Sequence, residues 1–414
     1  MAGMAPSFSP SLSAPIDATA EQGSWASIVL IYVIGVLSAT TIGQVIPVIG
    51  DIARIFHAGP AAGWIISIPS ALVAVGAVLA GWLVDRWGDK TVLLGGSAII
   101  IGGDLGAAQA GSLQWLLAWR VVEGVGYFCI SVSALSLLAR TTFGRRRNSA
   151  LTLWSSYIPM SFALPFLLAS QLQGPGRWRW AFYGHAIALG ALLCVAAFQL
   201  PRGRSVDSGS RAAGLATVLR TPGPFVLGLA FASTAFMQTG VLSVLPRLLT
   251  SHYGVGIGVA ASIGTLGMMF KAAGCLAGGP LLNRRIAPLA IATVGALLAL
   301  SGGVAIGFLL PSFSVAVVMS SVFFFGAGLV VGLWALVPAV APSVQCMGAA
   351  SSVVTQVAIW GVLLGPPAAF AAQSHGGWTW QAAGIMVACA LIVLCIGLVT
   401  GKLTGTPSEK LGHP

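Results

Sequence analysis

Twelve apolar runs of about twenty residues, separated by short polar breaks, constrain this chain more than any other feature. A helix of that length spans a hydrocarbon core of roughly 30 Å. Only 7% of the 414 residues are charged and 57% are hydrophobic, whereas a soluble domain carries about 25% charged residues. Too few polar side chains are present to cover a water-facing surface. We therefore predict an all-α integral membrane protein that lies in a lipid bilayer.

The loops between the runs predict the orientation of the chain. An even number of spans puts both termini on one side, and Lys and Arg in short loops mark the cytoplasmic side. Fourteen such residues fall on one side and four on the other. We therefore expect the protein to lie in the cytoplasmic (inner) membrane of a bacterium, with both termini in the cytoplasm. The predicted spans are residues 25–49, 63–83, 91–110, 114–139, 149–171, 180–200, 223–246, 256–282, 287–310, 313–339, 347–371 and 380–400.

The longest cytoplasmic break predicts the domain organisation. Residues 201–222 are rich in Gly, Ser and Arg, and we interpret them as a cytoplasmic linker. The linker separates an N-terminal six-helix bundle, 25–200, from a C-terminal six-helix bundle, 223–401. Residues 1–24 are expected to form a disordered N-terminal tail, and residues 402–414 a C-terminal tail.

Two sequence similarities indicate that the bundles are repeats. Residues 81–86 (GWLVDR) return about 198 residues later as residues 279–284 (GPLLNR). The pair Trp178 and Trp180 returns about 200 residues later as Trp378 and Trp380. Parallel repeats of six spans predict a site near the membrane midplane between the halves, and alternating access by rocking.

The loop between the second and third spans carries a family signature. Residues 81–90 read GWLVDRWGDK and resemble the Gly-x-Leu-x-Asp-Arg-x-Gly-Arg-Lys loop of the major facilitator superfamily, with only Asp89 departing from it. The resemblance implies the fold of that family, twelve transmembrane helices in two six-helix pseudo-repeats. It also implies a conformational gate formed by Gly81, Asp85, Arg86, Gly88 and Lys90.

A second signature lies in the fourth span. Arg120, Gly124 and Gly126 resemble the Arg-x-x-x-Gly-x-Gly motif of the same family, whose arginine is implicated in proton coupling. Glu123 stands where many relatives carry Gln or another polar residue. The resemblance thus implies a role for Arg120 in coupling.

Charged residues deep in the apolar runs are the default functional candidates, because each costs roughly 3 kcal/mol or more unless it is compensated. Asp104 in span 3 and Arg120 in span 4 lie at matching depth, so the two can pair directly, and Glu123 is one turn from Arg120. One interpretation is a structural ion-pair network. The other is a proton relay with Glu123 as the first choice for the coupling proton and Asp104 as the second.

Lys271 is the fourth such charge and stands near the middle of span 8. The second half has no intramembrane acid to neutralise it. An anionic substrate could supply the countercharge, as in organic-anion members of the superfamily. Alternatively, Lys271 could form a salt bridge with the acidic cluster across the cavity. The third possibility is that Lys271 faces the lipid. The family architecture adds further substrate-binding candidates around the cavity, namely Tyr32, Gln44, Tyr127, Trp154, Tyr157, Gln238, Trp334, Gln356 and Trp360.

These features favour a proton-coupled symporter that moves a small organic anion, a carboxylate or a carboxylate-bearing chelate. The alternative is efflux of drugs or metabolites by proton antiport, although span 5 lacks the Gly-Pro-rich signature of the drug/proton antiporters. A membrane sensor or an integral-membrane enzyme is a third class. The chain has no phosphate-binding loop, nucleophile elbow or metal-ligand cluster. We expect no enzymatic activity, cofactor, metal or nucleic acid, and we expect a monomer.

The gate hypothesis generates a prediction for Asp85. We expect Asp85→Asn to alter transport kinetics, because the carboxylate is proposed to latch the outward-facing state by binding near the start of span 11, at Met347 and Gly348. Initial rates in proteoliposomes measure the effect. Unchanged kinetics would leave only the simpler interpretation, a turn with snorkelling charges.

Overall fold

The computed structural model describes residues 24–142, 146, 149–150, 153–154, 156–200, 216–307, 312–343 and 346–404. Inside helices, the side chains of residues 77–82, 85, 139–140, 347–348 and 402–404 are also left out of the description. Almost all of the predicted N-terminal tail, most of the linker 201–222 and most of the C-terminal tail lie outside the described residues.

The described part of the chain forms helices of which eleven segments are long and apolar enough to cross a membrane. A twelfth apolar helix, α8, is shorter and lies within the fifth predicted span. These segments confirm the predicted all-helical membrane fold. In the first half the elements are α1 (Trp25–Gly43), η1 (Ile46–Val48), α2 (Ile49–Ile55), η2 (Gly59–Ala61), α3 (Ala62–Ser67), η3 (Ile68–Ser70), α4 (Ala71–Trp87), α5 (Asp89–Ala108), α6 (Leu113–Thr141), α8 (Tyr157–Leu167) and α9 (Arg179–Gln199), where η marks a 3-10 helix.

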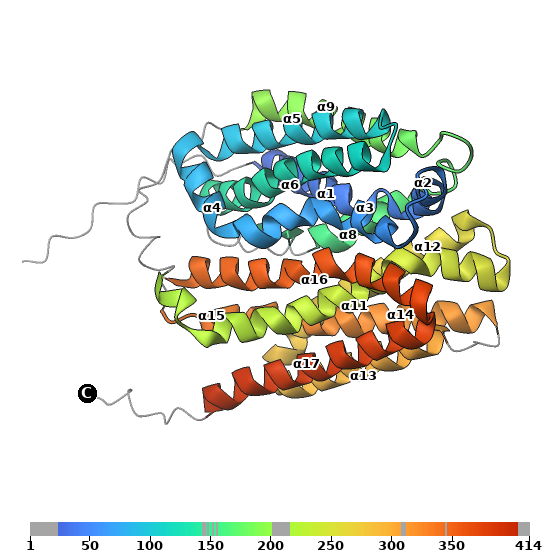
Figure 1. Cartoon of the computed structure of the whole chain (residues 1–414). Helices are drawn as coiled ribbons and strands as arrows, with labels where there is room; N and C mark the ends of the chain where they lie inside the picture. The colour runs from blue at the N-terminus through green and yellow to red at the C-terminus, as the bar shows by residue number, and fades with distance from the viewer. Residues whose placement is uncertain are drawn as a thin grey trace, which may run out of the picture.

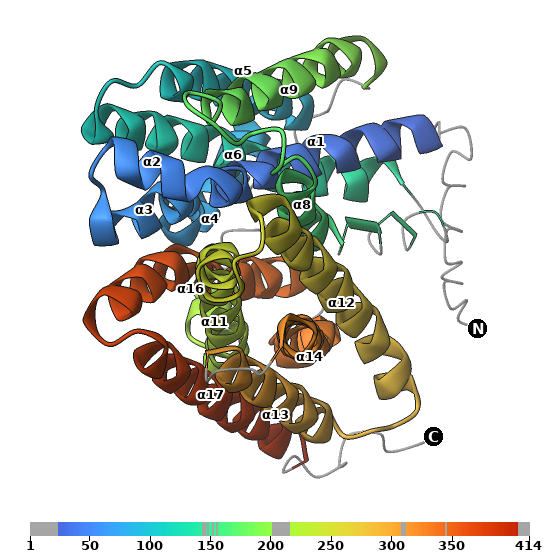
Figure 2. The same cartoon turned by 90° about the vertical axis from the view of Figure 1, so that its right-hand side faces the viewer.

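The second half of the chain forms the other group of helices, and Figures 1 and 2 both show this group packed beside the first. Its elements are α11 (Pro222–Tyr253), α12 (Ile257–Asn283), α13 (Pro288–Gly307), α14 (Phe313–Val331), η4 (Gly332–Leu336), α15 (Val337–Val340), α16 (Met347–His375) and α17 (Trp378–Thr404).

Two spans differ in detail from the sequence prediction. α11 continues past Pro246 to Tyr253 and stops where Gly254 adopts the left-handed conformation, at φ 65°, which glycine reaches without steric cost. The tenth span is interrupted, because α14 ends at Val331 and continues as the 3-10 helix η4, which begins six residues before Pro338.

Helix starts repeat between the halves. The Ser112 hydroxyl accepts from the Trp115 amide at 3.3 Å and begins α6. Ser312 accepts from the Val315 amide at 3.4 Å and begins α14 in the same way. Both serines are extended N-cap residues that satisfy a free amide of the first turn. The predicted repeat is therefore present even in the N-cap hydrogen bonds of corresponding helices.

Glycine contacts repeat as well. A Cβ added at Gly96 of α5 would lie 2.9 Å from the carbonyl oxygen of Gly126 on α6. In the second half, a Cβ at Gly295 of α13 would lie 2.8 Å from the carbonyl oxygen of Gly326 on α14. Small residues let membrane helices approach this closely, so the matching pairs fix α5 against α6 and α13 against α14 alike.

Two contacts between the halves lie near one end of the molecule, which we call the far end because it lies opposite the start of α1 and the end of α17 (Figure 1). α8 meets α12 there: the Thr265 hydroxyl donates to the Ala163 carbonyl oxygen at 3.5 Å, and Phe166 packs on Gly264. α3 meets α16 where Gly63 lies against Pro366 and Pro367. Figure 2 shows α8 beside α12 and α16 beneath α3 and α4.

The α3 contact predicts the effect of a methyl group at Gly63. The Cβ of an alanine at position 63 would fall 2.5 Å from the Pro367 nitrogen and 2.7 Å from the Pro366 carbonyl carbon. Moving these backbone atoms aside costs about 1–3 kcal/mol of folding free energy. We expect Gly63→Ala to lower the melting temperature and to increase amide exchange in residues 362–375. Gly50→Ala is the matched control, because nothing lies within 4 Å of a Cβ there; equal effects of both changes would contradict the contact.

Candidate functional site

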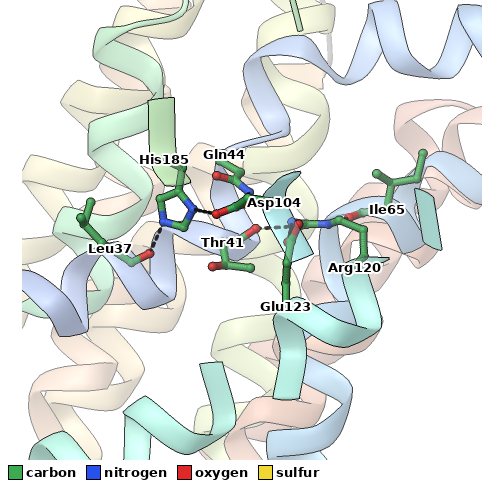
Figure 3. Close-up of polar contacts among 8 residues, drawn as sticks. All are labelled: Leu37, Thr41, Gln44, Ile65, Asp104, Arg120, Glu123 and His185. Carbon is green, nitrogen blue, oxygen red and sulfur yellow. Dashed lines mark hydrogen bonds and ion pairs between the residues drawn. The ribbon is translucent and has the colours of Figure 1, made fainter. Parts of the chain in front are cut away.

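Arg120 on α6 is the centre of a buried polar cluster in the first half. Its Nη1 donates to Glu123 Oε2, its Nε to the carbonyl oxygen of Ile65 at 2.8 Å, and its Nη2 to the carbonyl oxygen of Thr41 at 2.6 Å. Figure 3 shows these contacts converging on one guanidinium. Arg120 thereby joins α6 to α3 and to α1, and the predicted proximity of Arg120 and Glu123 is present.

Glu123 has one oxygen free. Its Oε2 pairs with Arg120, while its Oε1 is buried and has no hydrogen-bond partner among the described residues. α5 covers this side chain closely, because a Cβ at Gly103 would lie 2.5 Å from Glu123 Cγ. A buried carboxylate oxygen without a donor is where a proton or a water can bind.

Asp104 does not pair with Arg120, so the direct pairing considered from the sequence is not what the structure contains. Asp104 on α5 instead lies 2.7 Å from His185 Nδ1 through its Oδ2, and its Oδ1 accepts from Gln44 Nε2 at 3.0 Å. Matching depth was inferred correctly, but the rotation of α5 about its axis points the carboxylate toward α9. Periodicity along one helix cannot give the rotation of its neighbour.

The sequence analysis did not assign His185 to the site. His185 lies on α9, and its Nε2 is 2.8 Å from the carbonyl oxygen of Leu37 on α1. The signal was present, because an ionisable residue inside a membrane span needs a partner. A scan restricted to Asp, Glu, Arg and Lys missed it.

One face of α1 touches both polar pairs. Leu37 contributes its carbonyl oxygen to His185, Thr41 contributes its carbonyl oxygen to Arg120, and Gln44 reaches Asp104. These positions are four and three residues apart, so they follow one side of the helix (Figure 3). A movement of α1 therefore changes both pairs together.

The second half has an apolar cluster at the corresponding place. The repeat offsets match Asp104 with Gly303, Glu123 with Phe323 and His185 with Ile385. A Cβ at Gly303 would lie 2.9 Å from Ile385 Cδ1 and 3.0 Å from Phe323 Cδ2. The three corresponding helices of the second half, α13, α14 and α17, thus pack without charged side chains at this place. The fold does not require the charges of the first half.

Aromatic candidates of the first half gather around the start of α8. The Tyr32 hydroxyl lies 2.8 Å from the Ser156 hydroxyl. Trp154 and Tyr157 stack with ring centroids 4.4 Å apart, and the Tyr127 hydroxyl interacts with that of Tyr157. The structure brings these four predicted residues, from α1, α6, α8 and the helical residues just before α8, into one aromatic group.

Lys271 is buried, with 5% of its surface exposed. Among the described residues, no carboxylate lies within ion-pair distance of it. Lys271 is seven residues after Gly264, the position that packs on Phe166 of α8, and its own carbonyl oxygen lies against Gly328 of α14. The contacts of Gly264 with Phe166 and of Thr265 with Ala163 run antiparallel, and the same register extended by six residues would bring Lys271 to the level of Tyr157.

The remaining second-half candidates do not form one group. Gln238 is buried on α11. Trp334 stacks on Phe231 with ring centroids 4.9 Å apart and is 37% exposed. Gln356 is half-buried on α16, and Trp360 on the same helix is 41% exposed. The described contacts link none of these four residues to Lys271.

Residues 81–90 comprise the last turns of α4, the single linking residue Gly88 and the first two residues of α5. Gly88 adopts φ 79°, where a side chain is strained. Lys90 Nζ donates to the carbonyl oxygens of Ala197 at 2.8 Å and Leu200 at 2.6 Å, and so caps α9. Arg86 is exposed. Beyond their helical backbone in α4 and α16, nothing is described for Gly81, Asp85, Met347 and Gly348.

Comparison with solved structures identifies the same architecture. A bacterial homologue of the human lysosomal transporter Spinster, in an inward-facing and unoccupied conformation, superposes with a TM-score of 0.76 at 18% identity, covering 92% of this chain and 98% of that one. The human organic anion transporter MFSD10 superposes with a TM-score of 0.65 at 17% identity, covering 90% and 98%. Identities this low show the fold alone.

Curated relatives match a shorter segment. The arabinose-proton symporter of Escherichia coli (strain K12) is 30% identical over 132 residues, 32% of this chain and 28% of the relative. The methylenomycin A resistance protein of Bacillus subtilis (strain 168) is 30% identical over 140 residues, 33% of this chain and 28% of the relative. The match thus spans less than a third of the length of each relative.

A family model covers most of the chain. The model of the Major Facilitator Superfamily matches residues 28–366, which include the polar cluster, the aromatic group and Lys271. The chain is a multi-pass membrane protein with the repeated helical architecture described above. It belongs to the Major Facilitator Superfamily.

Proposed function

We propose that this transporter moves a small organic anion, a carboxylate or a carboxylate-bearing chelate, together with protons across a bacterial cytoplasmic membrane. The observation that carries the proposal is Lys271, a buried ammonium with no carboxylate in reach among the described residues. A cation inside the membrane is costly unless an anion or water compensates it. A substrate carboxylate is the countercharge that binds when the cavity is filled and leaves when it is emptied.

The register of α8 and α12 supports a site between the halves. The register of the contacts between α8 and α12, extended along both helices, would bring Lys271 level with Tyr157, whose ring belongs to the aromatic group of Tyr32, Tyr127 and Trp154. An ammonium on one side and aromatic faces on the other fit an organic anion with an apolar body. We place the substrate there, with the remaining candidates Gln44, Gln238, Trp334, Gln356 and Trp360 around the path.

The polar cluster supports proton coupling. Glu123 is buried beside Arg120 and keeps Oε1 free, so it can gain and lose a proton without losing its pairing oxygen. Curated relatives of the matched segment include proton symporters for arabinose and galactose. We assign the coupling proton to Glu123, with Arg120 controlling its charge and Asp104 in a supporting role.

The far-end contacts support an alternating-access cycle. With α8 on α12 and α3 on α16, the far end is held closed. If both termini are cytoplasmic, as the loop charges predict, this arrangement is the inward-facing state, and a rocking of the halves would open the other side. The loop of residues 81–90, with Asp85, Arg86 and Lys90, would act as the gate of this cycle.

Drug or metabolite efflux by proton antiport is the second candidate. The similarity to the methylenomycin A resistance protein favours it. In that case the exposed rings of Trp334 and Trp360 would contact a hydrophobic substrate, and Lys271 would be a structural charge. The two candidates differ in the sign of the ligand that the protein binds.

Ligand binding tests the anion proposal. Purified protein is heated with benzoate, citrate, arabinose or tetraphenylphosphonium, because a ligand of the folded state raises the melting temperature. We expect stabilisation by a carboxylate. Lys271→Gln should weaken that binding roughly tenfold to a hundredfold, the cost of a lost charged hydrogen bond, while Lys271→Arg retains part of it.

Arg247→Gln is the matched control, since it removes one positive charge from an exposed position on α11. Equal losses of carboxylate binding in Lys271→Gln and Arg247→Gln would show that the effect depends only on the net charge of the protein. Stabilisation by tetraphenylphosphonium that persists in Lys271→Gln would favour efflux instead.

Proton coupling is tested with the carboxylate that stabilises the protein. In proteoliposomes, Glu123→Gln should abolish accumulation driven by a pH gradient, because the amide cannot take up the proton. Counterflow exchange at equal pH on both sides should persist, since it requires no net proton movement. Gradient-driven accumulation at the wild-type level in Glu123→Gln would remove Glu123 from the coupling step.

A further inference from the structure

The hydrogen bonds of His185 fix the number of protons that it shares with Asp104. His185 Nε2 lies 2.8 Å from the Leu37 carbonyl oxygen, which only accepts, so Nε2 carries a hydrogen. His185 Nδ1 lies 2.7 Å from Asp104 Oδ2. Two lone pairs would repel at that distance, so one proton lies between these atoms. Imidazolium with carboxylate and imidazole with carboxylic acid both satisfy this requirement, and both hold the same single proton.

The surrounding charges agree with that count. Among the described residues, Glu123 on α6 is the charged group that interacts with both members of the pair, and Glu123 is itself paired with Arg120; α1 contributes the Leu37 carbonyl and the Gln44 amide. Other ionisable residues of the helices packed around the pair, such as Asp89, Lys90 and Arg179, stand near helix ends. With one proton on the pair the cluster is neutral, and without it the cluster carries a buried negative charge, which is costly.

The proton also holds α1 in place. Losing it would set a lone pair of His185 against the Asp104 carboxylate and break the link from Leu37 through His185 to Asp104. α1 packs on α8, where Gly43 lies against Phe162 and the Thr40 hydroxyl shares its hydrogen between the carbonyl oxygens of Val36, at 2.9 Å, and Ser161, at 3.1 Å. α8 in turn makes the far-end contact with α12. A continuous series of contacts therefore connects the proton to the closure between the halves.

We propose that Asp104 and His185 form a second proton site, distinct from Glu123, whose single bound proton stabilises the state closed at the far end. The site rests on the proposed proton-coupled function, and it adds His185 as the residue that positions the proton. The proton enters from water and returns to water when α1 moves, so no other reactant is needed. The apolar counterpart formed by Gly303, Phe323 and Ile385 indicates that helix packing alone does not account for the pair.

Hydrogen–deuterium exchange of the full-length protein in nanodiscs, without substrate, tests the proposal between about pH 5 and 9. After correction for the intrinsic pH dependence of exchange, protection of residues 30–48 and 257–270 should fall roughly tenfold as pH rises, the scale of a charged hydrogen bond. Segments of α13 and α17 serve as the internal control, because their corresponding cluster is apolar and should show no step.

Asp104→Asn should retain protection at high pH, because the amide donates permanently to His185 Nδ1. His185→Gln, the second variant, should also lose the pH step, since no imidazole remains to share the proton. Ser97→Ala is the matched control on α5: its buried hydroxyl bonds only the Leu93 carbonyl oxygen of the same helix, and the step should remain. Glu123→Gln should keep the step while losing gradient-driven transport.

Three results would overturn the second site. They are a wild-type pH step in both Asp104→Asn and His185→Gln, a step that disappears in Glu123→Gln alone, and wild-type protection that does not change with pH. Failure of the anion or coupling experiments leaves this measurement unaffected, because it uses neither a substrate nor a gradient.

Discussion

A guanidinium inside a lipid-surrounded bundle must find all its partners within the protein, and the arrangement of the first half depends on how Arg120 does so. Its N–H groups reach Glu123, the Ile65 carbonyl and the Thr41 carbonyl, so one side chain on α6 fixes α3 and α1. Two of these acceptors are backbone carbonyls in helices, which accept a second hydrogen bond through their remaining lone pair. The cost of the buried charge is thereby offset without using both oxygens of Glu123, and that free oxygen makes the pair chemically useful.

The two halves share a backbone plan but differ in what fills it. Ser112 and Ser312 start corresponding helices, and the glycine pairs Gly96 with Gly126 and Gly295 with Gly326 bring corresponding helices together. Around that common frame, the second half packs apolar side chains where the first half packs charges. Burying ionisable groups is less favourable than burying a phenylalanine or an isoleucine of similar volume. The charged cluster is present in the first repeat only, which indicates that it serves a function other than packing the helices.

α1 is the element that can transmit a change in the charged cluster to the rest of the molecule. Its polar face contacts both charged pairs, and its other contacts lead to α8 and the far-end closure with α12. α5 and α9 are held at both ends by reciprocal caps, Lys90 on the last turn of α9 and Arg179 on the last turn of α5. This makes them a rigid support against which α1 can move. Lys271 lies on the opposite side of the interface, so substrate and protons would act on different halves of one closing contact.

The sequence by itself determined the class of fold, the number of apolar segments, the repeat and most of the charged residues of the site, because hydrophobic length, loop signatures and the cost of buried charge are properties of the chain. It placed Arg120 beside Glu123 correctly, since both lie on one helix. It did not place Asp104, whose partner His185 comes from a helix 81 residues away. Only the tertiary structure decided how each helix is rotated about its axis, and that rotation selects which of several polar residues at one depth become partners.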